Sequence, residues 1–481
     1  MRFFTVFILA LSTRAAVIPS RRSLNARQDT AAKLVVAHHI VGNTFPYTLQ
    51  DWTNDMTLAA ASGIDGFALN VGPDDFQTTQ TINAFQAAEA LGTNFKLFFS
   101  LDMSVLPCAT VDDAAALRAR VLNFTTHPNQ LQVNGRALVS TFAGESCTFG
   151  QDTVADGWRS QFTQSPDLKG QITFVPSFFI DPATFTDFSG VMDGAFNFNS
   201  GWPIQVTTSF ADGITSDLVG SGQGDVNDLN QFIGSNATDL QQIQDLATLA
   251  AGGAPLTYMA AVAPWFFTHF GADSFNKNFI FLADQHLYPK RWETLIAARD
   301  QIDIVEIVTW NDYGESHYIG PIEGALPTGS EVWVDNFPHQ AWLDLTLYYA
   351  TAFKTGTPPA IENDQIFMWA RPHPVDAQAP DPVPAPTNFQ LTQDQIWAVV
   401  LATAEGNVTL TDGISPPQSF DVVPGVNKLS IPIVPGGTLT GTLERNGQTV
   451  VQLATPGANF TFNGAPETFN YNVFVTSASS A

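Results

Sequence analysis

Strand-like and helix-like segments alternate over most of the chain, from Lys33 to about Pro358. The strand candidates are short apolar runs rich in β-branched residues, and the helix candidates carry apolar residues at helical spacing. Eight such units predict a (β/α)8 TIM-like barrel with enlarged loops, with a doubly wound open sheet as the alternative. The predicted strands are Leu34–His39, Ile64–Asn70, Phe95–Leu101, Arg136–Phe142, Gln171–Val175, Val191–Asn197, Pro255–Ala260 and Ile302–Thr309.

Amphipathic stretches lie between most of these strands and predict the covering helices. Gly63 and Gly92 stand where helices are expected to end, and Pro289 stands in a first turn, where proline is tolerated. The predicted helices are Leu49–Ala61, Thr79–Leu91, Asp112–Phe124, Val154–Gln164, Asp239–Leu249, Pro289–Ala298 and His339–Phe353.

The pattern changes after Pro358, where two proline-containing breaks are followed by short strand-like runs separated by turn signals. This pattern predicts a β-sandwich over residues 359–481 as an accessory domain of the barrel at residues 33–358. The predicted strands there are Ile366–Trp369, Ile396–Ala402, Asn407–Thr411, Ser419–Val423, Asn427–Val434, Leu439–Arg445, Thr449–Ala454, Asn459–Asn463 and Tyr471–Val475.

The composition limits the possible partners. Among the 481 residues, 45 acidic against 20 basic side chains give a net charge of −25, which disfavours nucleic acid and anionic membranes as partners. A neutral polymer is compatible with this charge, and the 12% aromatic content fits a carbohydrate-handling protein. We expect a monomer that needs no cofactor.

The N-terminus has the parts of a secretory signal at residues 1–16, with Arg2 before an apolar run and Ala15-Ala16 after it. Residues 17–32 contain Arg21-Arg22 and could be a propeptide, so the protein is expected to be extracellular or in a cell wall. In that compartment Cys108 and Cys147 are expected to form a disulfide. Four glycosylation sequons occur, at Asn123, Asn236, Asn407 and Asn459.

The candidate chemistry lies in the segment Ile307–Tyr318, where the eighth predicted strand ends in Asp312 and Glu315. Barrel enzymes present their chemistry at the C-terminal ends of their strands, and paired carboxylates suit glycosidic bonds, one as proton donor and one as base or nucleophile. Gly314 is expected to let the chain turn between the two acids. The candidate substrate-binding residues are His38, Asp65, Asn70, Asp102, Trp265, Trp310, Asn311, Tyr313, His317 and Tyr318.

A metal site is the competing interpretation of His38, His39, Asp102 and His317. These residues show neither the paired histidines of a zinc helix nor a calcium-loop pattern, so we expect no metal.

Three stretches, Ala37–Thr44, Gly63–Asn70 and Trp310–Ser316, together resemble fungal α-1,3-glucanases (mutanases) of glycoside hydrolase family 71. The resemblance covers the whole predicted barrel, although the family usually has Tyr or Phe where this chain has His39. It implies a secreted endo-acting hydrolase of α-1,3-glucan that works with inversion and without a metal. It also implies that Asp312 and Glu315 are the catalytic acids and that a β-sandwich follows the barrel.

Two alternatives stay open at this point: an inactive sugar-binding wall protein on the same fold, and an endoglycosidase for another α-linked glycan. The roles of the acids are also open. We expect Glu315 to donate the proton and Asp312 to act as base, helped by Asp65 or Asp102, but the two roles can be exchanged. A spacing of three residues is compatible with either inversion or retention.

Overall fold

The computed structural model describes residues 32–214, 225–250 and 256–480. The predicted signal peptide, nearly all of the predicted propeptide and Pro255 at the start of one predicted strand lie outside these residues. None of the described helices combines the length and the apolar character that crossing a bilayer requires.

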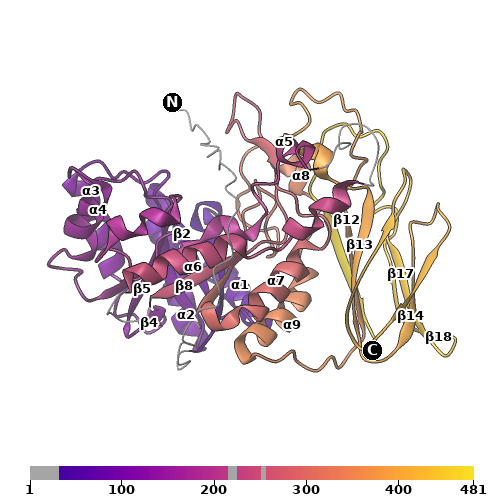
Figure 1. Ribbon diagram of the computed structural model, residues 1–481, viewed down its shortest axis with the longest axis horizontal. Coiled ribbons are helices and arrows are strands. Elements are labelled where there is room, and N and C mark those ends of the chain that lie inside the picture. Colours follow the sequence, from indigo (N-terminus) through magenta and orange to yellow (C-terminus); the bar gives the residue numbers. More distant parts are fainter. Residues whose placement is uncertain (1–31, 215–224, 251–255, 481) are drawn as a thin grey trace.

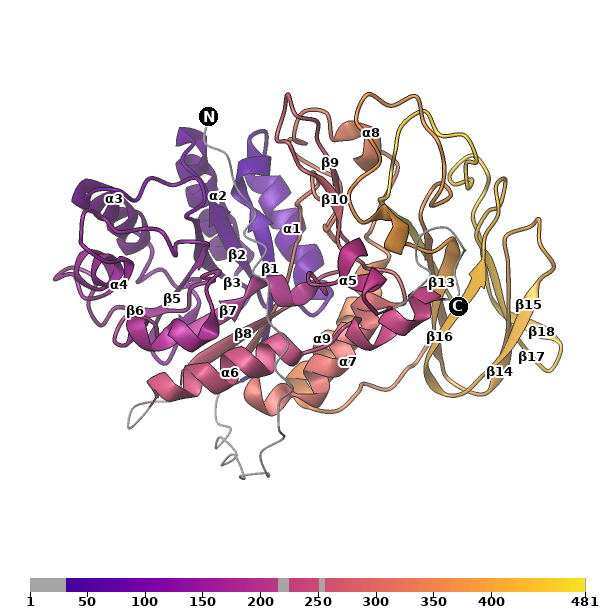
Figure 2. The same ribbon diagram turned by 45° about the horizontal axis from the view of Figure 1, so that its top comes forward.

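Within the described residues, eight parallel strands form one curled sheet, consistent with a TIM-like barrel (Figure 2). The first strand, β1, pairs in parallel with the last, β11, a pairing that the two common doubly wound strand orders do not contain. Two backbone hydrogen bonds join the remaining edges, from Asp193 N to Phe174 O (2.8 Å) and from Phe196 N to Pro176 O (3.0 Å). Each strand overlaps a predicted one: β1 Leu34–Ile40, β2 Gly66–Val71, β3 Lys96–Asp102, β5 Arg136–Phe142, β6 Ile172–Phe174, β7 Gly194–Asn197, β8 Thr257–Val262 and β11 Ile304–Ile307. A short strand, β4 (Gln132–Val133), runs antiparallel to β5.

The helices follow the predicted amphipathic stretches. Thr48 and Asp51 form a capping box that begins α1, and Gly92, with a φ of 63°, ends α2. The predicted helix at residues 154–164 is divided into α4 and a π-helical segment, Trp158–Thr163. The bounds are α1 Leu49–Ala61, α2 Asp75–Leu91, α3 Val111–Leu122, α4 Val154–Gly157, α5 Thr208–Asp212, α6 Ala237–Leu249, α7 Leu287–Ala297, α8 Glu331–Val334 and α9 Trp342–Thr355.

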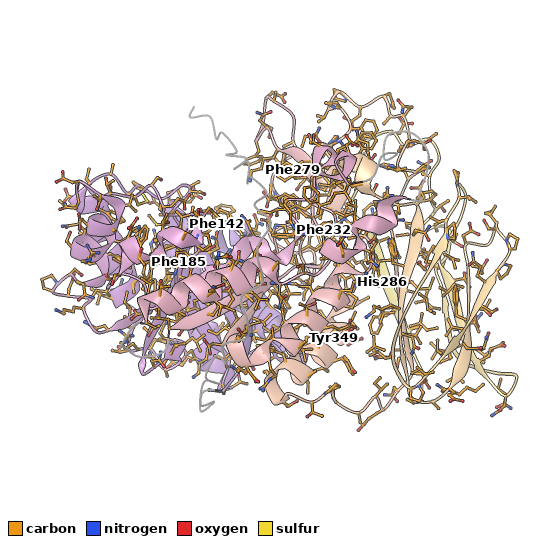
Figure 3. All side chains as sticks on the ribbon, in the orientation of Figure 1. Phe142, Phe185, Phe232, Phe279, His286 and Tyr349 are labelled. Atoms are coloured by element: carbon orange, nitrogen blue, oxygen red, sulfur yellow. A yellow bond between two sulfur atoms is a disulfide. The ribbon has the colours of Figure 1, made fainter. Side chains whose placement is uncertain are left out.

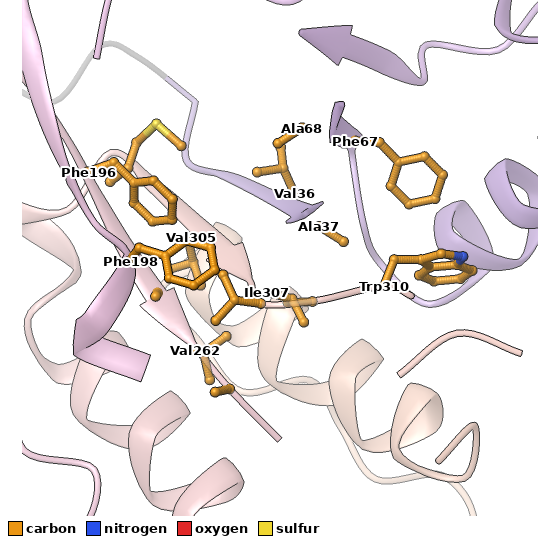
Figure 4. Close-up of a cluster of buried hydrophobic side chains, with 14 of the residues drawn as sticks. Val36, Ala37, Phe67, Ala68, Phe196, Phe198, Val262, Val305, Ile307 and Trp310 are labelled. Carbon is orange, nitrogen blue, oxygen red and sulfur yellow. The ribbon is translucent and has the colours of Figure 1, made fainter. Parts of the chain in front are cut away.

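The strands of the curled sheet are buried on both faces, as expected for a sheet covered by helices. Parallel pairing aligns His38 of β1 with Ala68 of β2 and with Phe98 of β3 beyond it, so these side chains share one face. On the opposite face, Trp310 packs beside Phe67, with ring centroids 5.2 Å apart (Figure 4).

The C-terminal part consists of two four-stranded antiparallel sheets, ordered β16-β13-β12-β19 and β15-β14-β17-β18 (Figure 1). Buried side chains from both sheets form one hydrophobic cluster. The bounds are β12 Gln365–Ala370, β13 Gln395–Ala402, β14 Gly406–Thr411, β15 Gln418–Val422, β16 Gly425–Pro432, β17 Thr440–Arg445, β18 Gln448–Ala454 and β19 Phe474–Ser479.

Two strand predictions in this part need correction. The predicted strand Asn459–Asn463 does not form, because Phe462 bonds with the turn at Gly436 and Gly437 instead of entering a ladder. The predicted strand Tyr471–Val475 begins only at Phe474.

Cys108 and Cys147 form the predicted disulfide. Cys108 follows β3 and Cys147 follows β5, so the disulfide joins two loops at the C-terminal ends of the strands. The N–H of Phe149 also donates to the carbonyl of Cys108, at 2.9 Å. The asparagines of the sequons at Asn123 and Asn459 are exposed, and those at Asn236 and Asn407 are half-buried.

Aromatic side chains join the first C-terminal sheet to the helices of the curled sheet. The ring centroids of Trp369 (β12) and Trp342 (α9) lie 5.7 Å apart. Those of Trp397 (β13) and His286, the residue before α7, lie 5.1 Å apart. His286 and Tyr349 mark this junction in Figure 3. Both tryptophans belong to the main core, so the sheet completes the burial of α7 and α9.

Trp369→Ala is therefore expected to lower the free energy of unfolding by about 3–5 kcal/mol, the usual cost of removing a large buried aromatic side chain. Val423→Ala, at a side chain that is 60% exposed, should change it by less than about 0.5 kcal/mol. Denaturant titration measures Trp369→Ala and Val423→Ala, and equal midpoints for Trp369→Ala and wild type would show that the junction is dispensable.

Truncation after Pro358 should give an insoluble barrel.

Candidate active site

The loop that follows β11 is tied to β1 and closed on itself by hydrogen bonds. The side-chain amide of Asn311 accepts from the N–H of Ile40 (2.7 Å) and donates to its carbonyl (3.1 Å), as a paired strand residue would. The N–H of Trp310 donates to the carbonyl of His38 (2.7 Å), and the N–H of Thr309 donates to the carbonyl of His317 (2.7 Å). The segment between Thr309 and His317, here called the acid loop, is therefore held at both ends.

The N–H of Ser316 donates to the carbonyl of Tyr313 at 3.0 Å, so Gly314 lies in a turn between the two acids, as expected. Its φ is not positive, and the left-handed residue of the acid loop is Ser316, with a φ of 58°. An added Cβ at Gly314 would lie 3.2 Å from Pro327 and 3.3 Å from the Phe270 ring, so the absence of a side chain also permits a close approach of these residues.

Asp312 and Glu315 meet at His317. The Nε2 atom of His317 lies 3.3 Å from Asp312 Oδ2 and 3.1 Å from Glu315 Oε2. The imidazole is 1% exposed, whereas the two carboxylates are 23% and 22% exposed, so the acids face the solvent from a buried histidine. One oxygen of each carboxylate and a nitrogen of His317 all lie within 4.8 Å of one another.

The charges at this cluster stabilise one another. Burial alone would lower the pKa of His317, but Asp312 and Glu315 outweigh it and raise that pKa to about 9. Burial alone would raise the pKa of Glu315, but Lys277 and His317 lower it to about 2. Glu315 is therefore a carboxylate and His317 an imidazolium over the neutral pH range.

Lys277 is a site residue that the sequence motifs did not indicate. Its Nζ donates to Glu315 Oε1 at 2.7 Å, and the negative charge of Glu315 raises the pKa of the lysine. It belongs to the hairpin of β9 (Phe267–His269) and β10 (Asn278–Ile280), here called the lysine hairpin, which follows β8 (Figure 2). No pattern in the sequence connects this hairpin with the acid loop 38 residues later.

His38 and Glu306 form a buried pair inside the curled sheet. The Nδ1 atom of His38 lies 2.6 Å from Glu306 Oε1, and the two side chains are 2% and 0% exposed. Burial raises the pKa of Glu306, because the contact with His38 offsets only part of its desolvation. Glu306 was not expected in the site, although a lone acid within an otherwise apolar strand was a signal that it needed a buried partner.

Asp102 is a third carboxyl group, at the C-terminal end of β3. Its Oδ1 atom accepts from the backbone N–H (3.1 Å) and the hydroxyl (2.5 Å) of Ser104. Burial raises its pKa, although Ser104, His38 and Lys277 act in the opposite direction. Asn70, at the C-terminal end of the neighbouring strand β2, pairs with Ser100 in the register.

Asp65 lies at the opposite end of the strands. It precedes β2, accepts from the backbone N–H of Val35 (2.9 Å) and binds Lys354 (2.8 Å). It lines a cavity of about 830 Å³ at the N-terminal ends of the strands. The expectation that Asp65 contacts substrate is therefore wrong in position, because the first residue before a strand lies away from the site.

Five of the predicted substrate-binding residues are buried scaffold. The Tyr313 hydroxyl donates to Pro321 O (2.8 Å), the Tyr318 hydroxyl to Phe337 O (2.6 Å) and the Trp265 indole to Tyr471 O (2.8 Å). Trp310 is 0% exposed, and both polar atoms of Asn311 bond to Ile40. None of these five offers a surface to a ligand in this structure. The predicted residues that the structure brings to the mouth of the sheet are His38, Asn70, Asp102, Asp312, Glu315 and His317.

The similarity to known proteins extends over nearly the entire chain. Residues 31–481 match the model of glycosyl hydrolase family 71. The chain belongs to glycosyl hydrolase family 71. It is 40% identical to a glucan endo-1,3-alpha-glucosidase of Schizosaccharomyces pombe, over 87% of this chain and 89% of that protein. It is 32% identical to a mutanase of Penicillium rubens, over 92% and 88%, and 30% identical to an ascus wall endo-1,3-alpha-glucanase of S. pombe, over 92% and 97%.

Among solved structures, a GH99 endo-alpha-mannosidase of Bacteroides thetaiotaomicron aligns with a TM-score of 0.46 and 9% identity, over 69% of this chain and all of that one.

The residues of the alternative metal interpretation do not converge in this family 71 chain. His39 points away from the site and contacts Asp55 of α1 at 3.1 Å, while His38 binds Glu306. Asp312, Glu315 and His317 are close enough to hold a cation, but the ammonium of Lys277 already contacts Glu315, and His317 favours a proton.

The pKa of His317 predicts a pH dependence of stability. The stability that comes from the protonated imidazole is fully present below the unfolded pKa of about 6.5 and is lost as the pH rises through the folded pKa of about 9. Wild type should therefore lose its advantage over His317→Gln, by on the order of 3 kcal/mol, between pH 6.5 and 9. Chemical denaturation at several pH values measures this, and a constant difference across that range would contradict it.

The buried pair predicts opposite outcomes for two substitutions of Glu306. Glu306→Gln keeps the shape and an acceptor for His38 while removing a buried charge, so it should alter the free energy of unfolding by less than about 1 kcal/mol. Glu306→Ala leaves a cavity and a buried imidazole nitrogen without a partner, and should cost about 2–4 kcal/mol. Equal losses for the two variants in thermal unfolding would rule out this account.

Proposed function

We propose that this protein is a secreted, endo-acting hydrolase of α-1,3-glucan that cleaves its substrate with inversion. The observation that carries the proposal is the pair of carboxylates at His317, at the C-terminal end of β11, in a chain of family 71. The printed names of three relatives, each aligned over most of its length, support the α-1,3-glucan substrate. The name of the ascus wall relative supports an extracellular or cell-wall location.

Asp312 and Glu315 are the proposed catalytic acids, but their separation favours a third participant. An inverting enzyme needs carboxyl groups roughly 6.5–9.5 Å apart, with a water molecule held by the base. One oxygen of Asp312 and one of Glu315 lie within 4.8 Å of each other beside one histidine, and we therefore place both acids on the same side of the cleaved bond. Asp102 is a carboxyl group at the C-terminal end of another strand, β3.

We assign the proton donor to Asp102 in place of Glu315. Burial raises the pKa of Asp102, which is the direction that suits a proton donor, whereas Lys277 and His317 lower the pKa of Glu315. Asp312 takes the base role expected for it. The fixed carboxylate of Glu315 then stabilises the positive charge that develops at the anomeric carbon.

The reaction proceeds in one step. Asp312 accepts a proton from a water molecule as the water oxygen bonds to the anomeric carbon, and the glycosidic bond breaks as Asp102 protonates the leaving oxygen. The attack comes from the face opposite the leaving group, so cleavage of an α-linkage releases a β-anomer.

The sequence boundaries give the proposed division of labour. Residues 33–358 form the catalytic barrel and residues 359–481 a β-sandwich, because the two C-terminal sheets share one buried cluster. The sandwich supports the barrel through the contacts of Trp369 with Trp342 and of Trp397 with His286. We propose that the protein acts as a monomer.

Asp312→Asn and Glu315→Gln should each fold normally and lose at least about a thousandfold in turnover of α-1,3-glucan. Asp102→Asn should lose a similar factor on glucan but retain most of the wild-type rate on an α-glucosyl fluoride, whose leaving group needs no proton. Asp312→Asn should not recover on the fluoride. A Glu315→Gln variant that recovers there while Asp102→Asn does not would return the donor role to Glu315.

Digestion of α-1,3-, α-1,4- and β-1,3-glucan by the purified protein tests the substrate, with proton NMR of the fresh products. Products of several lengths from α-1,3-glucan alone, formed as the β-anomer, are expected. An initial α-anomer would exclude inversion and would favour Asp312 and Glu315 acting alone as a retaining pair. Binding without hydrolysis of any of the three would favour the inactive sugar-binding protein.

A further inference from the structure

Three exposed aromatic rings stand on the face of the molecule that carries the acids. Within the described residues, most of the exposed large hydrophobic side chains are aliphatic, and the aromatic ones are Phe45, Phe179 and Phe275. Their exposed fractions are 65%, 38% and 60%. Phe45 follows β1, Phe179 follows β6 and Phe275 belongs to the lysine hairpin after β8, so all three lie on loops at the C-terminal ends of parallel strands.

Each of these rings is braced by a second phenylalanine. Phe76 contacts Phe45 with ring centroids 5.2 Å apart and planes at 90°, and Phe270 contacts Phe275 at 4.7 Å and 63°. In an edge-to-face contact the partner covers at most one face of a ring. A single exposed hydrophobic residue needs no explanation. Phe45 and Phe275 differ from such a residue because each also packs against a second ring, which restricts its orientation.

Phe179 is braced in the same way, by Phe142 at 5.2 Å and 74°. Phe142 in turn contacts Phe198 at 5.0 Å, and Phe198 contacts His38 at 5.3 Å. A continuous series of ring contacts therefore leads from Phe179 to the buried pair at the site. Phe142 is marked in Figure 3 over the curled sheet.

The other two rings are joined to the acid loop. Phe45 comes two residues after Asn43, whose side-chain amide donates to the carbonyl of Asn311 at 2.9 Å. Phe275 comes two residues before Lys277, which binds Glu315. Because β11 lies between β1 and β8 in the sheet, Phe45 and Phe275 belong to loops on opposite sides of the acids.

We propose that Phe45, Phe179 and Phe275 are platforms on which glucose residues of the substrate stack, on both sides of the bond that is cleaved. The C–H face of a pyranose ring is apolar and matches an aromatic face, and the neutral glucan experiences no repulsion from the acidic protein. This inference rests on the proposed function and extends it, because platforms on either side of the acids bind an interior stretch of a long chain.

The test uses Phe45→Ala, Phe179→Ala and Phe275→Ala on α-1,3-linked oligosaccharides of increasing length. Each variant should lose roughly tenfold in kcat/KM on long substrates, the equivalent of one apolar contact, with little loss on the shortest substrate that is cleaved. The loss should lie in KM, because the acids are unchanged. With substrates labelled at the reducing end, Phe45→Ala and Phe275→Ala should shift the cleavage point in opposite directions.

Two further sets of variants provide the controls. Ile414→Ala removes another exposed side chain (62% exposed), between β14 and β15, and should leave the length dependence unchanged. Phe→Trp at each platform should restore the affinity for long chains. Phe→Leu keeps apolar volume without a flat face and should behave like Phe→Ala in kinetics even where its thermal stability equals that of wild type.

The outcomes separate the two proposals. If wild type cleaves α-1,3-glucan and the three alanine variants keep its length dependence, the platforms are wrong and the function stands. If wild type cleaves no α-1,3-glucan, the proposed function fails. Affinity electrophoresis of wild type and the three alanine variants in glucan-containing gels then tests whether the rings bind glucan, and equal retardation of all four proteins would overturn the platforms. A wild type that sediments as a dimer, with Phe45→Ala/Phe275→Ala as a monomer, would make these rings a subunit interface and overturn the proposal.

Discussion

The pairing of Asn311 with Ile40 is the contact on which the geometry of the site depends. Strand β11 is only four residues long, Ile304–Ile307, and it ends before the acids. The Asn311 amide, bonded to both backbone groups of Ile40, continues the β1–β11 pairing beyond the last residue of the strand. A side chain that takes the place of a backbone partner lets the chain leave the sheet while its position remains fixed. Asp312 is the next residue, so its position follows directly from that of β1.

The second constraint is electrostatic. Two carboxylates whose oxygens lie within 4.8 Å would repel each other in a partly dehydrated site, and a single buried imidazolium offsets both. Lys277 adds a second positive charge on Glu315 alone, so the two acids are not equivalent. This asymmetry, and not the spacing of the acids in the sequence, is what distinguishes their proposed roles.

Much of the fold could be predicted from the sequence, because each parallel strand is a short apolar run and each turn has local signals. Asp312 and Glu315 were recognisable because they directly follow such a run. The aromatic residues beside them were misinterpreted: Trp310, Tyr313 and Tyr318 look like sugar-binding rings, but each is 0% exposed. Sequence shows that a loop is aromatic but not which of its side chains turn inward. Lys277 could not be predicted, since its contact with Glu315 depends on the path of a hairpin that no local pattern specifies.

The lysine hairpin in turn depends on the C-terminal part of the chain. His269 of β9 binds Asp381 at 3.0 Å, and the N–H of Ile280 on β10 donates to Thr387 O at 3.0 Å. Asp381 also accepts from the N–H of Phe469 at 2.9 Å, which ties the hairpin to the segment before β19. Residues that follow the curled sheet therefore hold the hairpin that carries both Lys277 and Phe275. The loops of the C-terminal part thus contribute to the site without supplying a reacting group, because they position the hairpin that carries the positive charge of Lys277 beside Glu315.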